Sequence, residues 1–235
     1  MFYMAEIYHV LSRGVDKRKI FLCDEDRYRF IHDLFEFNDT EPVNNLTYRF
    51  RNKNNKDIVS PYIGSVGKGR REYRRLLVNL HAFCLMPNHY HLLVSARVKD
   101  GVTSFMRKLN IGYAKYFNGG YERTGALFEG RYKSVPIQSD AHFIHIPYYI
   151  HLNPLDLIMP EWRKREISDS KEAMKFLGKY KWSSFQDYIG KKNFPSVTQR
   201  EFLNEFFEGP AQYKKDTLKW LKEMNLEEIK QVTLE

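Results

Sequence analysis

The segment Phe83–Val94 most constrains what this chain can fold into, because it combines an apolar β-strand pattern with two closely spaced histidines, His89 and His91. Side chains alternate across a strand, so we expect both imidazole rings on the same face. Two neutral imidazoles on one rigid strand offer two ligands to a divalent metal ion. A pair of partly exposed surface histidines is the alternative that this motif alone leaves open.

A second segment, residues 142–154, predicts a helix that carries a phenol and an amide on one face. The 3.6-residue period stacks His145, Tyr149 and Asn153 at successive i, i+4 positions. Tyr148 falls on a neighbouring face, so this geometry favours Tyr149 as the reactive tyrosine. An amphipathic helix that buries both tyrosines in the core is the alternative.

Two prolines constrain this helix, one after its expected end and one within it. Asn153 precedes a proline and is therefore disfavoured from helical geometry, so we expect the helix to end there. Asp140 is an expected N-cap, which leaves Pro147 inside the helix as a kink. Alternatively the helix begins near Pro147, and His145 then loses its place on the stripe.

Together the two segments resemble a known family. The pattern "MPNHYHLLV", followed 58 residues after His91 by Tyr149 in "YYIHLNP", is similar to the single-tyrosine HUH transposases. The similarity is greatest to the REP-associated tyrosine transposases and their insertion-sequence relatives. It continues through four further segments and spans most of residues 5–190: "YHVLSRGVDKRKIF" (Tyr8–Phe21), "SFMRKLNIGYAKYFN" (Ser104–Asn118), "GALFEGRYKSVPI" (Gly125–Ile137) and "WSSFQDYIG" (Trp182–Gly190).

The resemblance implies an α+β fold, a ferredoxin-like antiparallel sheet with helices packed on one face. The expected order of strand, helix, strands, helix, strand and helix is compatible with it. We therefore expect a catalytic domain in residues 1–158, in which residues 38–76 form a long loop or an insertion. The composition shifts near Met159, so residues 159–235 are expected to form a helical C-terminal extension.

The resemblance also implies a mechanism, in which His89, His91 and Asn153 bind Mg²⁺ or Mn²⁺ and the metal polarises a DNA phosphate. Tyr149 then attacks, leaving a 5′-phosphotyrosine and a free 3′-OH, so that strands are rejoined without ATP. A free tyrosine has a pKa of about 10, which calls for a proton acceptor, and His145 is the residue that we expect to serve. The implied substrate is single-stranded or hairpin DNA.

The charge of the chain agrees with a polyanionic partner. Lysine and arginine number 38 against 29 aspartates and glutamates, which gives a formal net charge of +9 and a pI near 9.3. Basic turns are often only solvated, and this alternative stays open for each cluster. Seven basic residues are expected to contact DNA: Arg13, Lys17, Arg107, Lys108, Lys115, Arg131 and Lys133.

Other sequence features exclude several classes of protein. No run of eighteen apolar residues exists, so no membrane-spanning helix is expected. Residues 1–7 lack a basic region of the secretory type. Cys23 and Cys84 stand 61 residues apart and are expected to be free thiols of a reducing, cytoplasmic environment. A basic membrane-surface protein would need an apolar amphipathic helix, which the sequence lacks.

Two other functions remain alternatives at this point. A non-catalytic, domesticated relative would bind hairpin DNA or RNA and regulate, without cleaving it. A metal-dependent nuclease would cut DNA with activated water and would form no covalent adduct. The sequence does not decide whether the protein acts as a monomer or as a homodimer.

Overall fold

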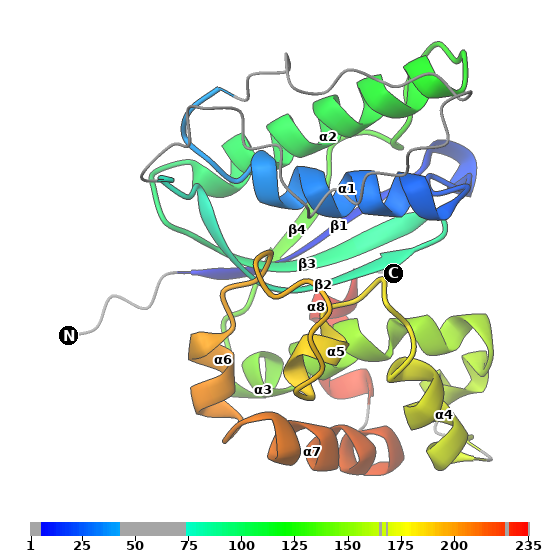
Figure 1. Cartoon of the computed structure of the whole chain (residues 1–235). Helices are drawn as coiled ribbons and strands as arrows, with labels where there is room; N and C mark the ends of the chain where they lie inside the picture. The colour runs from blue at the N-terminus through cyan, green and yellow to red at the C-terminus, as the bar shows by residue number, and fades with distance from the viewer. Residues whose placement is uncertain (1–5, 43–73, 165, 168, 224–225, 235) are drawn as a thin grey trace.

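The computed structural model describes residues 6–42, 74–164, 166–167, 169–223 and 226–234. Its first part follows the order β1, α1, β2, β3, α2, β4 (Figure 1). The bounds are β1 Ile7–Arg13, α1 Asp24–Glu36, β2 Val78–Met86, β3 His89–Ala96, α2 Gly101–Gly120 and β4 Lys133–Pro136. The four strands form one sheet of order β2-β3-β1-β4, in which every neighbouring pair is antiparallel. This is the ferredoxin-like arrangement, so the predicted fold class is confirmed.

Alternation along β3 divides its side chains between two cores. Tyr90, Leu92 and Val94 belong to the apolar cluster beneath α1 and α2, together with residues of those helices. Leu93 belongs instead to a second cluster on the opposite face of the sheet. The sheet is therefore buried on both sides, and its second face is free of α1 and α2.

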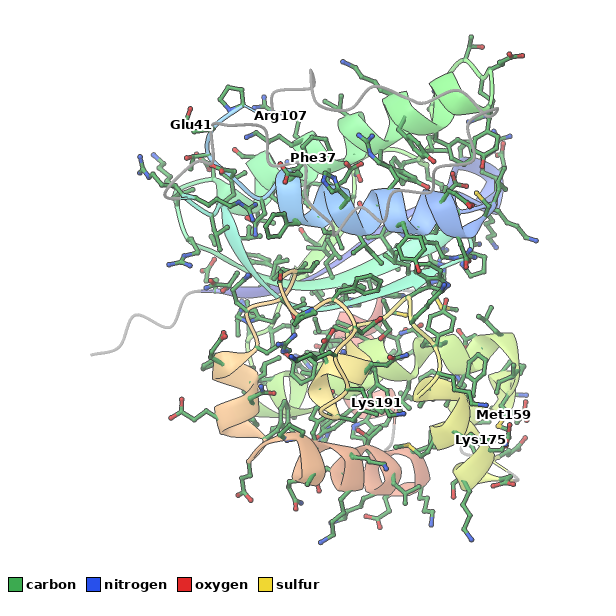
Figure 2. All side chains as sticks on the ribbon, viewed as in Figure 1. Phe37, Glu41, Arg107, Met159, Lys175 and Lys191 are labelled. Carbon is green, nitrogen blue, oxygen red and sulfur yellow. The ribbon has the colours of Figure 1, made fainter. Side chains whose placement is uncertain are left out.

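A second layer of helices covers that face (Figure 1). It consists of α3 Asp140–Leu152, η3 Asn153–Leu157, η4 Pro160–Lys164, α4 Ser170–Leu177, α5 Phe185–Tyr188, α6 Glu201–Phe206, α7 Pro210–Glu223, η5 Leu226–Ile229 and α8 Lys230–Thr233. Side chains fill the spaces above and below the sheet (Figure 2). The expectation of helices on one face therefore describes only the α1 and α2 side. The boundary at residue 159 stays a prediction, because α3 and the later helices share one apolar cluster.

The segment after α4 covers the outer edge of β2. The Leu85 amide donates to the Trp182 carbonyl at 2.9 Å, and the Ser184 amide donates to the Phe83 carbonyl at 3.0 Å. An uncovered edge strand invites pairing with other chains. The "WSSF" segment thus protects the sheet and ties the C-terminal helices to it.

Several helix boundaries differ from the expected ones by one to three residues. The N-cap of α1 is Cys23, whereas the sequence pattern favours the next residue, Asp24, and the N-cap of α3 is Ser139 rather than the expected Asp140. The Ser139 hydroxyl accepts from the His142 amide, as serine commonly does at this position. Helix α2 begins at Gly101, whereas the sequence pattern favours a start near Thr103 or Ser104.

The structure defines the histidine segment and the tyrosine helix more closely than the sequence does. The histidine segment is a hairpin, because β2 ends at Met86 and β3 starts at His89 after a two-residue turn. Pro147 lies inside α3, so the alternative in which the helix begins at this proline is wrong. Asn153 is the C-cap of α3, which confirms the predicted helix end.

Most of the expected long loop, residues 43–73, lies outside the described residues. Cys23 and Cys84 are free thiols, as predicted. Within the part of the chain that the structure describes, none of the helices is long and apolar enough to cross a membrane.

The start of α2 gives a stability prediction. A Cβ atom on Gly101 would lie 2.2 Å from the Leu77 carbonyl oxygen, a clash with backbone. We expect Gly101→Ala to lower the free energy of unfolding by roughly 1–3 kcal/mol in urea denaturation. Gly119→Ala in the same helix is the control, because no atom lies within 4 Å of its Cβ position. That variant should be neutral or gain up to about 1 kcal/mol. Equal stability of the two variants would contradict the close approach.

Candidate active site

His89 and His91 lie side by side on the second face of the sheet. Their ring centroids are 5.0 Å apart with an interplanar angle of 82°. His91 has no exposed surface and His89 is only 8% exposed. The alternation argument therefore places both rings together, and the alternative of partly exposed surface histidines is wrong.

A third histidine, His9 of β1, fixes the proton on His91. His9 Nδ1–H donates to the Val232 carbonyl, since a carbonyl only accepts. The neutral His9 ring then has its lone pair on Nε2, which lies 2.9 Å from His91 Nδ1. His91 Nδ1–H donates into that lone pair. The His91 lone pair is thereby placed on Nε2, the form in which an imidazole ligates a metal.

The turn before β3 does the same for His89. Asn88 Nδ2 donates to the Lys17 carbonyl at 3.2 Å, which orients the amide so that its oxygen faces His89. His89 Nδ1 lies 2.7 Å from that oxygen and must be its donor. The lone pair of His89 is therefore on Nε2 as well. Hydrogen bonding within the fold prepares both predicted ligands in the same tautomer.

Tyr149 of α3 packs directly against this histidine pair. Its ring centroid is 6.0 Å from that of His91 and 6.1 Å from that of His9, both in edge-to-face geometry. The Tyr149 side chain has no exposed surface. The phenol is therefore beside the predicted metal ligands, but this arrangement is closed to solvent.

Tyr148 points into the C-terminal helices instead. Its ring stacks on Tyr213 at 4.8 Å and packs edge-to-face on Phe207 at 5.2 Å. Burial, with a smaller contribution from Asp216, raises the pKa of the Tyr148 hydroxyl well above its usual value. Tyr148 is therefore directed away from the histidine pair, and the choice of Tyr149 as the reactive tyrosine stays a prediction.

His151, the last histidine of α3, holds the helical layer together. Its Nδ1 lies 2.7 Å from the Tyr213 hydroxyl and its Nε2 lies 2.8 Å from the Ser184 hydroxyl. Complete burial lowers the pKa of His151 to about 3, so this ring stays neutral. Because both nitrogens are engaged, His151 acts as a structural residue.

Arg163 of η4 connects the nucleophile to the amide. Its Nη1 donates to the Tyr149 hydroxyl oxygen at 3.1 Å, and its Nη2 donates to Asn153 Oδ1 at 2.9 Å. The guanidinium also lies 5.4 Å from the centroid of the Tyr149 ring. Asn153 Nδ2 in turn donates to the Tyr149 carbonyl at 2.9 Å. The three side chains therefore form one hydrogen-bonded unit.

Asp156 of η3 holds Arg163 in place. Arg163 Nε donates to Asp156 Oδ1 at 2.9 Å and Nη2 donates to Oδ2 at 2.6 Å, the bidentate geometry of a strong guanidinium–carboxylate pair. The Trp162 indole donates to the same carboxylate at 2.6 Å. Arg163 and Asp156 are 26% and 25% exposed, whereas Tyr149 and Asn153 are fully buried. This ion pair is the solvent-facing edge of the site.

The donor set fits Mg²⁺ or Mn²⁺ in part. The two imidazoles have their lone pairs on Nε2, a nitrogen through which imidazole can ligate a cation, although Mg²⁺ and Mn²⁺ favour oxygen ligands. The third predicted ligand, Asn153 Oδ1, accepts from the Arg163 guanidinium, which a cation at the same oxygen would repel. Among the described residues no group of three or more His, Cys, Asp or Glu side chains could hold a metal. A complete shell therefore depends on Asn153 or on the substrate.

The predicted proton acceptor, His145, is engaged elsewhere. The Trp220 indole donates to His145 Nδ1 at 2.9 Å, and an indole N–H is only a donor. A neutral His145 then has its proton on Nε2 and has no lone pair left for the phenol proton. This hydrogen bond disfavours the proton-acceptor role, because it uses the lone pair of the neutral ring. The donor comes from α7, so the residue spacing within α3 could not predict the contact.

Comparison with known proteins agrees with this arrangement of residues. Residues 48–153 match the family model described as "Transposase IS200 like". This segment is similar to the IS200-like transposases. It contains the histidine pair, Tyr149 and Asn153, and it is somewhat less than half of the chain.

A solved structure is also similar to the chain. It is described as a REP-associated tyrosine transposase bound to a REP hairpin, with 12% sequence identity and a TM-score of 0.48. The similarity covers 84% of this chain and 87% of that one. No curated protein matches the sequence.

Four of the seven basic residues expected to contact DNA lie near the end of the sheet that carries His89. Arg13 of β1 lies opposite His89 of β3 in the strand register. The Lys17 carbonyl accepts a hydrogen bond from the Asn88 side chain. Lys133, the first residue of β4, lies opposite Leu11 of β1 in the strand register. Arg131, two residues earlier, is exposed. DNA contact by these four residues stays a prediction.

The other three basic residues lie on α2, across the sheet from the histidine pair and Tyr149 (Figure 1). Arg107 and Lys115 are exposed there. Lys108 donates through its ammonium group to the Asp39 carbonyl and, at 2.8 Å, to the Glu41 carbonyl. Lys108 therefore stabilises the chain after α1, and the α2 residues do not line the site.

Sequence analysis missed His9, Asp156 and Arg163. His9 had a signal, since it is a histidine in an apolar strand, but its contact depends on β1 lying beside β3. Arg163 lies in a charged segment that resembles any solvated turn. No local pattern distinguishes it from its neighbours.

The role of His9 gives a prediction for metal binding. We expect His9→Phe to weaken Mn²⁺ binding by roughly 10- to 100-fold, because His91 loses the acceptor that fixes its tautomer. Binding is measured from the electron paramagnetic resonance signal of unbound Mn²⁺. The control is His81→Phe, which removes another buried histidine that contacts Ser95 on the sheet. Equal weakening in both variants would argue against a specific role for His9.

Proposed function

We propose that this protein cleaves and rejoins single-stranded DNA, in hairpin-containing ends or repeats, through a 5′-phosphotyrosine at Tyr149. The observation that carries the proposal is the edge-to-face packing of Tyr149 on His91, whose ring nitrogens are ordered by His9. A phenol beside two metal-competent imidazoles, in a segment similar to the IS200-like transposases, supports phosphoryl transfer. The net charge of +9 supports a nucleic-acid substrate.

In the proposed cleavage step, a bond forms between the Tyr149 oxygen and the scissile phosphorus. The bond from phosphorus to the 3′ oxygen breaks, and that oxygen takes up a proton as the phenol loses its own to solvent. Bound at His89, His91 and Asn153, Mg²⁺ or Mn²⁺ would supply Lewis-acid polarisation of the phosphate. The reverse step releases Tyr149 and restores the phosphodiester, so no nucleotide hydrolysis is needed.

Arg163 serves the phenol oxygen in both directions. A guanidinium has donors and no acceptor, so Arg163 cannot take the phenol proton. It stabilises negative charge on the oxygen as attack begins and again as Tyr149 leaves. Preorganised donors of this kind are worth about 10²–10³-fold in rate.

Substrate must enter through the edge formed by Arg163 and Asp156. Because Tyr149 is buried, a phosphate reaches it only when this ion pair rearranges. A DNA phosphate matches a guanidinium as well as Asp156 does. Substrate binding would therefore draw Arg163 from Asp156 and release Asn153 Oδ1 for the metal.

A second function has one observation in its favour. The closed site, with Arg163 on both Tyr149 and Asn153, is also what a non-catalytic hairpin-binding regulator would show. A nuclease that uses activated water is the other alternative. The presence of a covalent adduct distinguishes the proposed function from both.

The nucleophile is tested with a hairpin oligonucleotide, Mn²⁺ and a denaturing gel. The wild type should form a covalent protein–DNA adduct, and Tyr149→Phe should abolish it while DNA binding changes by less than about twofold, since the ring is retained. The matched control is Tyr148→Phe, which alters the neighbouring tyrosine and should leave the adduct in place. Loss of the adduct in Tyr148→Phe alone would reverse the assignment. Cleavage without any adduct would support the water-activated nuclease.

The Arg163 contact predicts a rate effect. We expect Arg163→Gln to slow adduct formation by about 10²–10³-fold, because the charged donor to the phenol oxygen is lost. Added guanidinium ion should restore part of the rate in Arg163→Ala, which a purely structural role would not allow. Arg200→Gln is the control, since Arg200 pairs with Asp187 in the C-terminal layer. An unchanged rate in Arg163→Gln would remove Arg163 from the mechanism.

A further inference from the structure

A groove of about 530 Å³ lies between α4 and α7, in the part of the chain beyond the transposase-family match. Its floor is apolar, with Met174 and Leu218 among the lining side chains. Six lysines surround it, and we call it the lysine groove: Lys171, Lys175, Lys179, Lys191, Lys214 and Lys215. Figure 2 labels Lys175 and Lys191, both in the helical layer below the sheet.

Positive charge exceeds negative charge around the lysine groove. No aspartate or glutamate is among the described residues that line it. Lys175 pairs with Glu172 at 3.4 Å, and Lys191 donates to the Gly178 carbonyl at 3.2 Å. Within the described ranges the other four lysines form no ion pair, and all six are exposed. Six like charges around one hollow create a focused positive potential.

The sequence places these lysines together at a cost to the helices. Lys171, Lys175 and Lys179 follow one another at four-residue spacing along α4 and just beyond it. Like charges at this spacing destabilise a helix. Of the neighbouring carboxylates, Asp169 caps α4 and also attracts Lys171 and Lys175, and Asp216 accepts from Gln212. An anionic ligand would remove the repulsion.

The chemistry of the groove suits a phosphate backbone. Lysine binds phosphate as a compact charge, without the planar fork that reads base edges. No aromatic side chain is among the described residues that line the groove, so nothing there would stack a base. Such a surface would bind DNA independently of sequence and with strong dependence on salt.

The groove is also connected to the active site through α4. Helix α4 packs against η3, which carries Asp156, and against α7, which carries Lys214 and Lys215. The solvent-facing edge of the site and the groove therefore adjoin the same helix.

We propose that the lysine groove binds the phosphate backbone of the DNA strand that extends beyond the Tyr149 site. The proposal rests on the proposed function, and it assigns the helical extension the task of holding flanking DNA. The hairpin and the cleavage site would be bound elsewhere. The groove would add affinity only to substrates that are long enough to reach it.

The test compares two double variants of equal charge in the full chain. Lys179→Gln with Lys214→Gln alters the groove, and Lys192→Gln with Lys222→Gln alters exposed lysines outside it. Both are titrated over a range of salt with a hairpin oligonucleotide that has a long single-stranded flank and with one that lacks the flank. For the flanked DNA, log K falls as log salt rises, and the groove variant should make this negative slope shallower by roughly 1.4, about 0.7 for each lysine. The control variant and the unflanked DNA should show no such change.

Three results would overturn the proposal: equal slopes for the two variants, no binding of flanked DNA by the wild type, or a groove-dependent binding of anionic vesicles with an unchanged DNA slope. The adduct assay separates this outcome from the fate of the proposed function. An adduct on unflanked DNA without groove dependence on flanked DNA removes the groove proposal alone. Groove-dependent binding without any adduct supports the groove and removes the covalent mechanism.

Discussion

The hydrogen bond between His9 and His91 is the interaction on which the rest of the site depends. It joins β1 to β3 on the face that α3 covers, and it places the lone pair of His91 on Nε2. The Val232 carbonyl, in α8, accepts from His9 Nδ1–H, so that His9 Nε2 is the acceptor for His91. A site that begins in the sheet is therefore completed by the last helix, which ties the extension to the chemistry.

The second constraint is the ion pair that closes the site. Arg163 is held by Asp156 and in turn holds Tyr149 and Asn153. Buried polar groups need such partners, because a phenol or an amide without them would destabilise the core. The same contacts that stabilise the closed arrangement also place the positively charged guanidinium next to the Tyr149 oxygen. One guanidinium, that of Arg163, therefore stabilises the site without DNA and supplies the positive charge that a DNA phosphate would contact.

The local parts of this structure could be predicted from the sequence. Strand alternation places His89 and His91 on one face. The tyrosine helix ends at Asn153 as expected, but Asn153 keeps right-handed helical dihedrals and the chain continues as η3, so the pre-proline rule gave the position and not the reason. The parts that sequence patterns do not contain depend on contacts between distant segments. His145 is engaged by Trp220, which lies 75 residues later in the chain. Arg163 reaches Tyr149 only because η3 and η4 fold back on α3, and no periodic pattern records that reversal.

The central claim is that the Tyr149 oxygen is the atom that bonds to DNA phosphorus. Mass spectrometry of the isolated covalent complex, after digestion with nuclease and protease, tests it most directly. We predict a nucleotide 5′-phosphate attached to Tyr149 in the peptide that also contains Asn153. A nucleotide on Tyr148 or on any other residue, or unmodified peptides throughout, would contradict this account.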